Sequence, residues 1–208
     1  MNDRPLEKQN RRQFLKLLSA GSLVCFGCGH LCALTGAQKT PVSPGKHKFL
    51  EDSKMSFEDV FKFTYQQVVN IMKTMEAKMG KEKLLEMLKE ASDNMGINMA
   101  KQMAQAQPEG KNDVAAFTTQ LRNPDHFWKH VYTVEIVRDA ATDFEVRMKE
   151  CLWAKTLRGF DAADIGYAMI CHGDFAMARA FNPKLRMTRT KTLMEGHDCC
   201  NHRWIMEV

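Results

Sequence analysis

Two clusters of chemically reactive side chains lie near the C-terminus of this 208-residue chain. The first is the run from Cys171 to Asp174, and the second is the run from Asp198 to His202. Thiol, imidazole and carboxylate groups attack carbon atoms, transfer protons or bind metals. Two such clusters in one short domain indicate a chemical site rather than packing alone.

The first cluster places a thiol and a carboxylate three residues apart on a predicted helix. Positions at this spacing lie on one helix face, so Cys171 and Asp174 can share a pocket. A neighbouring base or cation would lower the pKa of the thiol and make Cys171 a nucleophile. The alternative is a buried structural cysteine beside a helix-capping aspartate, and the residue types alone favour that alternative.

The second cluster lies on a predicted strand, where alternate residues share a face. Asp198, Cys200 and His202 would then point to one side, where they can orient a water molecule, relay a proton or bind zinc. A zinc site would need a further donor from the first cluster, such as Cys171. The usual pair of Cys-x-x-Cys motifs is missing, so we assign no metal ligands and predict no cofactor. If a metal were bound, zinc is the ion that these donors would suit.

Two arginines precede the second cluster. The guanidinium group binds a carboxylate through two parallel hydrogen bonds, so it can hold an acidic small-molecule substrate. We assign this role to Arg189 and interpret Arg186 as part of a solvated strand face.

Residues 1–37 have the features of an export signal. The run from Arg11 to Lys16 pairs two arginines with following apolar residues, and it resembles the twin-arginine signal. An uncharged stretch over 17–34 and small residues up to Ala37 come next. We therefore expect recognition by the twin-arginine translocation machinery and export of the folded protein to the periplasm. The membrane would be contacted only through this segment, which would act as an anchor if it stays uncleaved.

Cleavage after Ala37 would change both the charge and the cysteine content. The formal net charge of +5 would fall to +2, because five basic and two acidic residues are removed. A near-neutral chain gives no reason to expect nucleic acid as a partner. The remaining cysteines are Cys151, Cys171, Cys199 and Cys200. An oxidising compartment favours two disulfides among them, whereas export in the folded state favours reduced thiols.

The chain after the signal is expected to begin with a linker and then with helices. Residues 38–54 are rich in Pro, Lys, Gly and Ser, which is typical of a linker. Ser56, with Asp59 three residues later, predicts the start of a helix. The predicted helical segments are 57–75, 81–94 after a break at Gly80, and 96–107.

Two hairpins with intervening helices follow. The predicted segments are a half-buried strand over 130–138, a turn over 139–143, a strand over 144–151, helices over 152–159 and within 162–181, a strand over 185–194, a turn over 195–197 and a strand over 199–206. We therefore predict a single α+β domain over 55–208, with a small, mainly antiparallel sheet that helices cover on one face.

The C-terminal half resembles the L-2-amino-thiazoline-4-carboxylic acid hydrolase family. The resemblance rests on Cys171 to Asp174, on Asn182-Pro183 and on the run from Thr190 to Cys200. It implies hydrolytic opening of a small cyclic amidine that bears a carboxylate, at a carbon–nitrogen bond. The resemblance implies Cys171, Asp174, Asp198 and Cys200 as catalytic residues. The family commonly has an aromatic residue where His202 stands, so the substrate-binding roles that we assign to Arg189 and His202 rest on their own chemistry. The thiol of Cys171 or an activated water molecule would attack the ring carbon, and the two aspartates would transfer protons.

Two other functions stay open, because cysteine biosynthesis is cytoplasmic whereas the signal indicates export. One is a non-catalytic periplasmic module that binds a small molecule, since the second hairpin is similar to binding domains of the vinyl-reductase type. The other is a metal or redox protein with Cys171, Cys200 and His202 as ligands. A retained ligand without turnover would support the first function, and bound metal would support the second.

Overall fold

The computed structural model describes residues 54–108, 111–126 and 128–207. The chain divides into two units, Met1–Lys54 and Met55–Val208, and all the described elements belong to the second. The predicted signal over 1–37 and nearly all of the predicted linker over 38–54 lie outside the described residues. Within the described ranges, no helix offers the long apolar stretch that a bilayer crossing requires.

The described chain begins with two long helices, α3 (Phe57–Met79) and α4 (Lys81–Gln105). The start predicted for α3 is confirmed: the Ser56 hydroxyl accepts from the Asp59 backbone N–H at 3.1 Å, and the Asp59 carboxylate accepts from the Ser56 backbone N–H at 3.3 Å. These reciprocal bonds satisfy two backbone donors that a helix start leaves without partners. The predicted division into pieces over 81–94 and 96–107 is wrong, because α4 continues without a break through Gly96.

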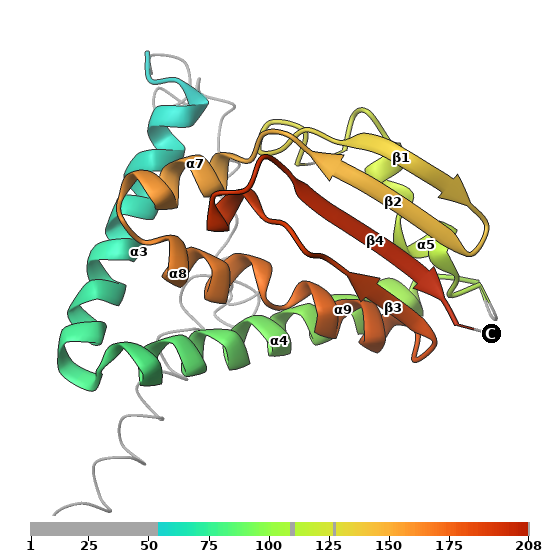
Figure 1. Ribbon diagram of the computed structural model, residues 1–208, viewed down its shortest axis with the longest axis horizontal. Coiled ribbons are helices and arrows are strands. Elements are labelled where there is room, and N and C mark those ends of the chain that lie inside the picture. The colour runs from blue at the N-terminus through green and yellow to red at the C-terminus, as the bar shows by residue number, and fades with distance from the viewer. Residues whose placement is uncertain (1–53, 109–110, 127, 208) are drawn as a thin grey trace, which may run out of the picture. The chain divides into compact units, whose positions relative to one another are not determined.

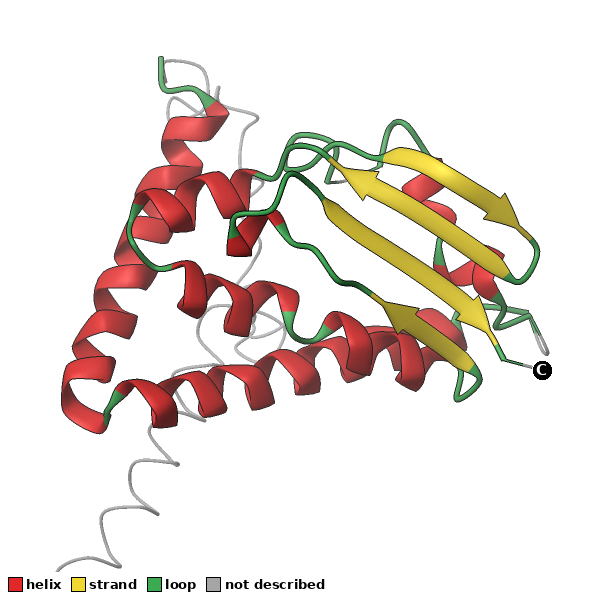
Figure 2. Ribbon diagram, viewed as in Figure 1, coloured by secondary structure: helices red, strands yellow, loops and turns green. Residues whose placement is uncertain are grey.

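Four antiparallel strands form one sheet in the order β1-β2-β4-β3 (Figures 1 and 2). They are β1 (Glu135–Ala140), β2 (Asp143–Met148), β3 (Leu185–Thr188) and β4 (Cys200–Met206). Both predicted hairpins are present, and β2 joins them by pairing with β4 as well as with β1. The predicted α+β class with a small antiparallel sheet is therefore confirmed.

All four strands are shorter than the sequence pattern predicts, and two of them differ most. The strand predicted over 130–138 begins only at Glu135, and its predicted half-buried character is wrong, because all six residues of β1 are exposed. The turn between β1 and β2 contains only Ala141 and Thr142 instead of 139–143. The strand predicted over 185–194 ends at Thr188. The next residue, Arg189, lies outside the strand, and its side chain donates a hydrogen bond to Asp174, which lies in a helix.

Shorter helical segments connect the strands. They are α5 (Val114–Phe117), α6 (Thr119–Arg122), α7 (Leu152–Gly159), α8 (Ala163–Gly166), the π-helical turn η2 (Tyr167–Cys171), α9 (Asp174–Phe181) and the 3-10 helix η3 (Leu193–Glu195). The bounds predicted for α7 are confirmed, as is the partly helical character of 162–181.

The sheet buries one face against helices and leaves the other face more polar. Alternate residues of three strands form the buried face: Phe144, Val146, Met148, Leu185, Met187, Cys200, His202 and Trp204. Helix α9 packs on both α4 and β3, and Figure 1 shows α4 and α9 running alongside each other at that edge of the sheet. The cluster Cys171 to Asp174 lies where η2 meets α9, so it is carried to the sheet by this packing.

Small residues allow α4 to approach the start of α9 very closely. Ser92, Gly96 and Ala100 recur at four-residue spacing on the buried face of α4. The Ser92 hydroxyl accepts a hydrogen bond from the Gly173 backbone N–H at 3.0 Å. A Cβ atom at Gly173 would overlap the Ser92 carbonyl, and one at Gly96 would lie 2.7 Å from the Gly173 carbonyl oxygen. The turn between Cys171 and Asp174 is thus fixed against α4 by backbone contact.

Replacement of Gly173 by alanine should therefore destabilise the fold. We expect Gly173→Ala to lower the free energy of unfolding by about 1–3 kcal/mol, because the added methyl group forces the two segments apart. Gly159→Ala is the matched control, since a Cβ atom there meets nothing within 4 Å; its effect should stay within about 1 kcal/mol. Urea denaturation of both variants measures the difference. Equal stability of the two variants would contradict the close contact.

Candidate functional site

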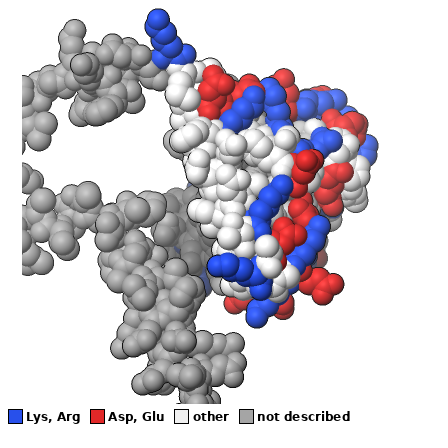
Figure 3. Space-filling view, turned by 90° about the vertical axis from the view of Figure 1, so that its left-hand side faces the viewer, with Lys and Arg blue, Asp and Glu red and all other residues white. Residues whose placement is uncertain are grey.

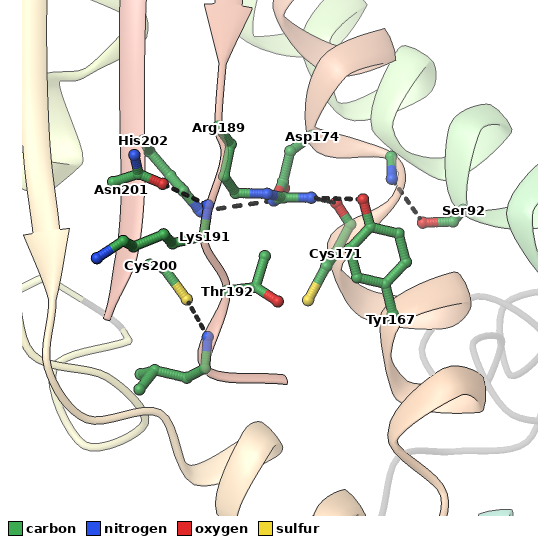
Figure 4. A network of polar contacts seen from close by, with 12 residues as sticks. Ser92, Tyr167, Cys171, Asp174, Arg189, Lys191, Thr192, Cys200, Asn201 and His202 are labelled. Atoms are coloured by element: carbon green, nitrogen blue, oxygen red, sulfur yellow. Dashed lines mark hydrogen bonds and ion pairs between the residues drawn. The ribbon is translucent and has the colours of Figure 1, made fainter. Parts of the chain in front are cut away.

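The centre of the candidate site is the guanidinium group of Arg189, which directly follows β3. Its side chain is only 2% exposed. One terminal nitrogen donates to an Asp174 carboxylate oxygen at 2.6 Å, and the other donates to the Cys171 carbonyl oxygen at 2.9 Å (Figure 4). A buried cation is stable only when it is paired and hydrogen-bonded, and these two contacts meet that requirement. They connect the end of β3 to both residues of the predicted Cys-x-x-Asp motif.

Two aromatic rings complete the surroundings of this cation. The central carbon of the guanidinium lies 4.9 Å from the Phe175 ring centre and 5.5 Å from that of Tyr167. The Tyr167 hydroxyl also accepts from Arg189 at 3.4 Å. Ring faces attract cations, and the attraction is stronger away from water. Arg189 is therefore held on several sides by the segment 167–175.

The π-helical turn η2 presents the Cys171 carbonyl to Arg189. The His172 backbone N–H donates to the Tyr167 carbonyl at 2.9 Å, five residues back, so the helix is locally wider than an α-helix. Such turns are uncommon and occur frequently at functional sites.

The strand alternation predicted for the second cluster is confirmed for two of its three residues. Cys200 and His202 are both buried on the inner face of β4. The prediction for Asp198 is wrong, because β4 begins only at Cys200 and Asp198 lies in the loop before it. The Asp198 side chain is 70% exposed and binds the Lys191 ammonium at 2.9 Å. It does not join the group around Arg189.

His202 contacts this group as a neutral ring. Its Nε2 atom lies 3.5 Å from an Arg189 terminal nitrogen. Burial, together with the positive charge of Arg189, lowers the pKa of His202 to about 3. Because the guanidinium can only donate, the lone pair of Nε2 must face it, which places the ring proton on Nδ1.

The thiols near this group are kept protonated. Burial, reinforced by the Asp174 charge, raises the pKa of the Cys171 thiol far above its ordinary value. Burial also raises the pKa of Cys200 to about 11 and that of Cys151 above its usual range. Arg189 acts to lower the pKa of Cys171, but desolvation outweighs it, so the expected activation of this thiol by a neighbouring cation is wrong. All four cysteines of the described chain, Cys199 included, are free thiols.

Asp174 is the group of this site that titrates closest to neutral pH. Burial raises the pKa of Asp174 to about 6, although the Arg189 charge and hydrogen bond act in the opposite direction. Its side chain keeps 35% of its surface exposed, whereas that of Arg189 is closed off. Asp174 is thus a carboxyl group that solvent reaches and that changes charge in the range used for general acid–base catalysis.

Three residues of this environment were not predicted from the sequence. Tyr167 binds Arg189, as described above. Tyr132 lies near Asp174, and burial followed by the Asp174 charge raises the pKa of Tyr132 to about 12. Cys151, which forms a backbone bridge with Tyr132, is close enough to influence both Cys171 and Cys200. The only signal in the sequence is that each has a polar group in an apolar segment, which is too common to identify a site.

The metal-binding alternative receives no support from the geometry. Among the residues that the structure describes, no group of three or more His, Cys, Asp or Glu side chains could hold a metal ion. Cys171, Cys200 and His202 therefore do not form the ligand set that this alternative requires.

A surface hollow lies apart from the candidate site. It has a volume of about 380 Å³, and its lining residues are Gln107, Lys111, Asp113, Ala115, Ala116, Thr119 and Arg122. None of them contacts Arg189 or Asp174 through any bond described above. We therefore locate the candidate site by its chemistry and not by this hollow.

The fold and the site define an α+β domain with a buried cation beside a titratable carboxyl group. The model of the L-2-amino-thiazoline-4-carboxylic acid hydrolase family matches residues 60–204, which include both reactive clusters. The chain belongs to this family.

Other comparisons are more distant. No curated protein matches the chain. The phenol-responsive sensory domain of the transcription activator PoxR, crystallised with phenol, is 14% identical with a TM-score of 0.47, over 67% of this chain and 73% of that one. A trafficking protein particle complex subunit 3 from Naegleria fowleri, covalently bound to palmitic acid, is 10% identical with a TM-score of 0.44, over 73% of this chain and 95% of that one.

Loss of the Arg189 charge should destabilise the protein in a pH-dependent way. We expect Arg189→Gln to lower the free energy of unfolding by about 2–3 kcal/mol, less than for a fully buried pair because solvent reaches Asp174. Without Arg189 the pKa of Asp174 rises further, and a raised acid pKa costs stability as pH rises through it. The loss should therefore be larger at about pH 8 than at about pH 5.

Arg186→Gln is the matched control for this measurement. Arg186 is 43% exposed and pairs with Glu207 at 2.9 Å at the surface, so its removal should cost less than about 1 kcal/mol. Denaturant titrations at the two pH values provide the comparison. Equal losses for the two arginine variants would contradict the central role of Arg189.

Proposed function

We propose that this protein hydrolyses a small cyclic amidine that carries a carboxylate, of the 2-aminothiazoline-4-carboxylate type. The observation that carries the proposal is Asp174: a solvent-accessible carboxyl group with a pKa of about 6, held by Arg189, in a chain of this hydrolase family. A group that changes charge near neutral pH can both accept and return a proton during one turnover.

The proposed reaction adds one water molecule across the ring. The water oxygen attacks the ring carbon between nitrogen and sulfur, and a tetrahedral intermediate forms. The bond from this carbon to the ring nitrogen then breaks, and the carbon keeps the oxygen, the sulfur and the outer amine as a carbamoyl group. Both protons of the water end on the ring nitrogen, which leaves as an amine, so atoms and charges balance.

Asp174 is suited to move these protons. Its ionised form would take a proton from the attacking water, and its protonated form would deliver that proton to the leaving ring nitrogen. A carboxylate also accepts the two parallel N–H bonds that the protonated form of an amidine presents, which would orient the ring. Its free surface leaves room for such contact, because Arg189 is bound through only one of the two carboxylate oxygens in the described contacts.

Water is a better nucleophile than Cys171 in this proposal. Only a thiolate attacks carbon efficiently, and burial keeps Cys171 protonated. For water, Asp174 would remove the proton while the bond to carbon forms, so no free hydroxide is needed.

Arg189 would act as a positioning residue rather than as the anchor of the substrate carboxylate. Its two terminal nitrogens already donate to Asp174 and to the Cys171 carbonyl, and its side chain is almost completely buried. The assignment of proton transfer to Asp198 stays a prediction that its exposed position does not support.

Export to the periplasm through residues 1–37 is a separate part of the proposal. It rests on the paired arginines and the uncharged stretch that follows them. Hydrolysis by the domain over 55–208 does not depend on it.

Three variants separate the proposed roles in an assay of ring opening. Asp174→Asn should lower kcat by roughly 100-fold or more, because the amide cannot exchange a proton. Asp198→Asn is the matched control and should stay close to the wild type. Cys171→Ala should also keep most of the activity, since water is the proposed nucleophile. Circular dichroism confirms that each variant is folded, and inactivity of Cys171→Ala with activity in Asp174→Asn would reverse the assignment.

A further inference from the structure

The segment that follows Arg189 is held largely by a side chain instead of by strand pairing. Backbone pairing between β3 and β4 ends at Thr188. Beyond this point, the Asn201 side-chain oxygen accepts from the Thr190 N–H at 3.1 Å and from the Lys191 N–H at 2.7 Å (Figure 4). The Asn201 side chain also donates to the Thr190 hydroxyl at 2.9 Å, and its backbone N–H donates to the Lys191 carbonyl at 3.3 Å.

Two further side chains from the second reactive cluster and the turn before it bind the same segment. The Thr192 N–H donates to His197 Nδ1 at 3.3 Å, and the Leu193 N–H donates to the Cys200 sulfur at 3.2 Å. Four consecutive backbone donors thus end on three side chains, with Asn201 accepting two of them. Backbone N–H groups need such partners wherever a strand ladder stops. In the structure, Cys200 and its neighbours therefore serve to hold the chain that follows Arg189.

These bonds fix the backbone from which the Arg189 side chain extends. Alternate residues of β3 are buried on the inner face of the sheet, and the almost completely buried Arg189 side chain continues this alternation. The backbone of Arg189 is held on one side by the pairing of β3 and on the other by Asn201, which binds the next residue. A long side chain keeps one geometry only when its surroundings fix it, so the contact from Arg189 to Asp174 depends on this support.

We propose that Asn201 is a positioning residue, which holds the segment 189–191 so that Arg189 stays bound to Asp174. In the described contacts, the Asn201 side chain touches neither Arg189 nor Asp174, so it acts through the backbone. The placement of Arg189 stands on this geometry, whereas its effect on turnover rests on the proposed function.

The ionisation of Asp174 reports where Arg189 lies, because the guanidinium charge favours the carboxylate. Replacing Asn201 by alanine exchanges one uncharged side chain for another. The titratable side chains that influence Asp174 or Arg189 all remain in this variant: Tyr132, Cys151, Tyr167, Cys171, Cys200 and His202. A changed titration midpoint would therefore report a displaced Arg189 and not a new charge.

Carbon-13 NMR of the Asp174 carboxyl carbon in the full chain measures this effect without substrate. Asn201→Ala should raise the midpoint by about half a pH unit or more, because a displaced Arg189 favours the carboxylate less. The acid limb of the kcat/KM profile for ring opening should move upward with it. Asn201→Ser keeps an acceptor at shorter reach, so its shift should be smaller and in the same direction.

Asn182→Ala is the matched control, at the other end of β3. The Asn182 side chain also binds backbone, since it donates to the Asn112 carbonyl at 2.6 Å and accepts from the Lys184 N–H at 2.9 Å. Its loss should lower stability in urea to a similar extent and leave the Asp174 midpoint unchanged. Phe63→Ala changes an exposed side chain of α3, which lies on the side of the molecule that Figure 3 views, and it should leave the midpoint unchanged as well.

An unchanged midpoint in Asn201→Ala, with folding confirmed by circular dichroism, would overturn the positioning role. An equal shift in Asn182→Ala would overturn it too, because the effect would then be a general loss of stability. The two proposals fail separately. Full activity of Asp174→Asn would remove the hydrolytic role of Asp174, while a shifted midpoint in Asn201→Ala would still support the placement of Arg189.

Discussion

The buried ion pair between Arg189 and Asp174 is the interaction on which the candidate site depends. A guanidinium group stays charged even with 2% exposure, and burying that charge without partners would strongly destabilise the fold, so the chain must bring acceptors to it. This requirement explains why the strand pattern stops at Thr188, one residue before the arginine. It also explains why the Cys171 carbonyl, at the end of a π-helical turn, faces the end of β3. One cation thereby joins the sheet to the helical segment that carries the first cluster.

The same burial determines the chemistry that the site can perform. Desolvation keeps the thiols protonated and His202 neutral, and it moves the pKa of Asp174 toward neutrality. Cys171 and His202 are the residue types most often associated with catalysis, but burial keeps Cys171 as an unreactive thiol and His202 as an uncharged ring. The carboxyl group becomes the one member of the predicted catalytic set with an accessible proton transfer near neutral pH. The positive charge of Arg189 limits this rise, so that Asp174 can still ionise near neutral pH.

Features that depend on residues close in sequence are predicted well, whereas features that depend on contacts between distant segments are not. The capping box at Ser56, the bounds of α7 and the presence of two hairpins depend on residues close in sequence, and these are predicted correctly, whereas the bounds of the strands and turns are not. Gly96 has the pattern of a helix break, but it lies within α4 because Gly173, far away in sequence, needs the space. Substrate binding is likewise predicted for Arg189, because the sequence does not show that the packing of α9 brings Asp174 to it as a partner. The orientation predicted for the Asp198 side chain is wrong for a local reason, because strand alternation holds only once a strand has begun and β4 begins at Cys200.

Asp174 is expected to titrate near neutral pH because it is partly buried beside Arg189. Carbon-13 NMR of the side-chain carboxyl carbon, assigned by comparison with Asp174→Asn and followed across pH in the full chain, measures this ionisation without any substrate. We expect a midpoint near pH 6. A midpoint at or below the ordinary aspartate value of 3.8 would contradict it, because the ion pair would then outweigh burial and Asp174 would have no proton to transfer.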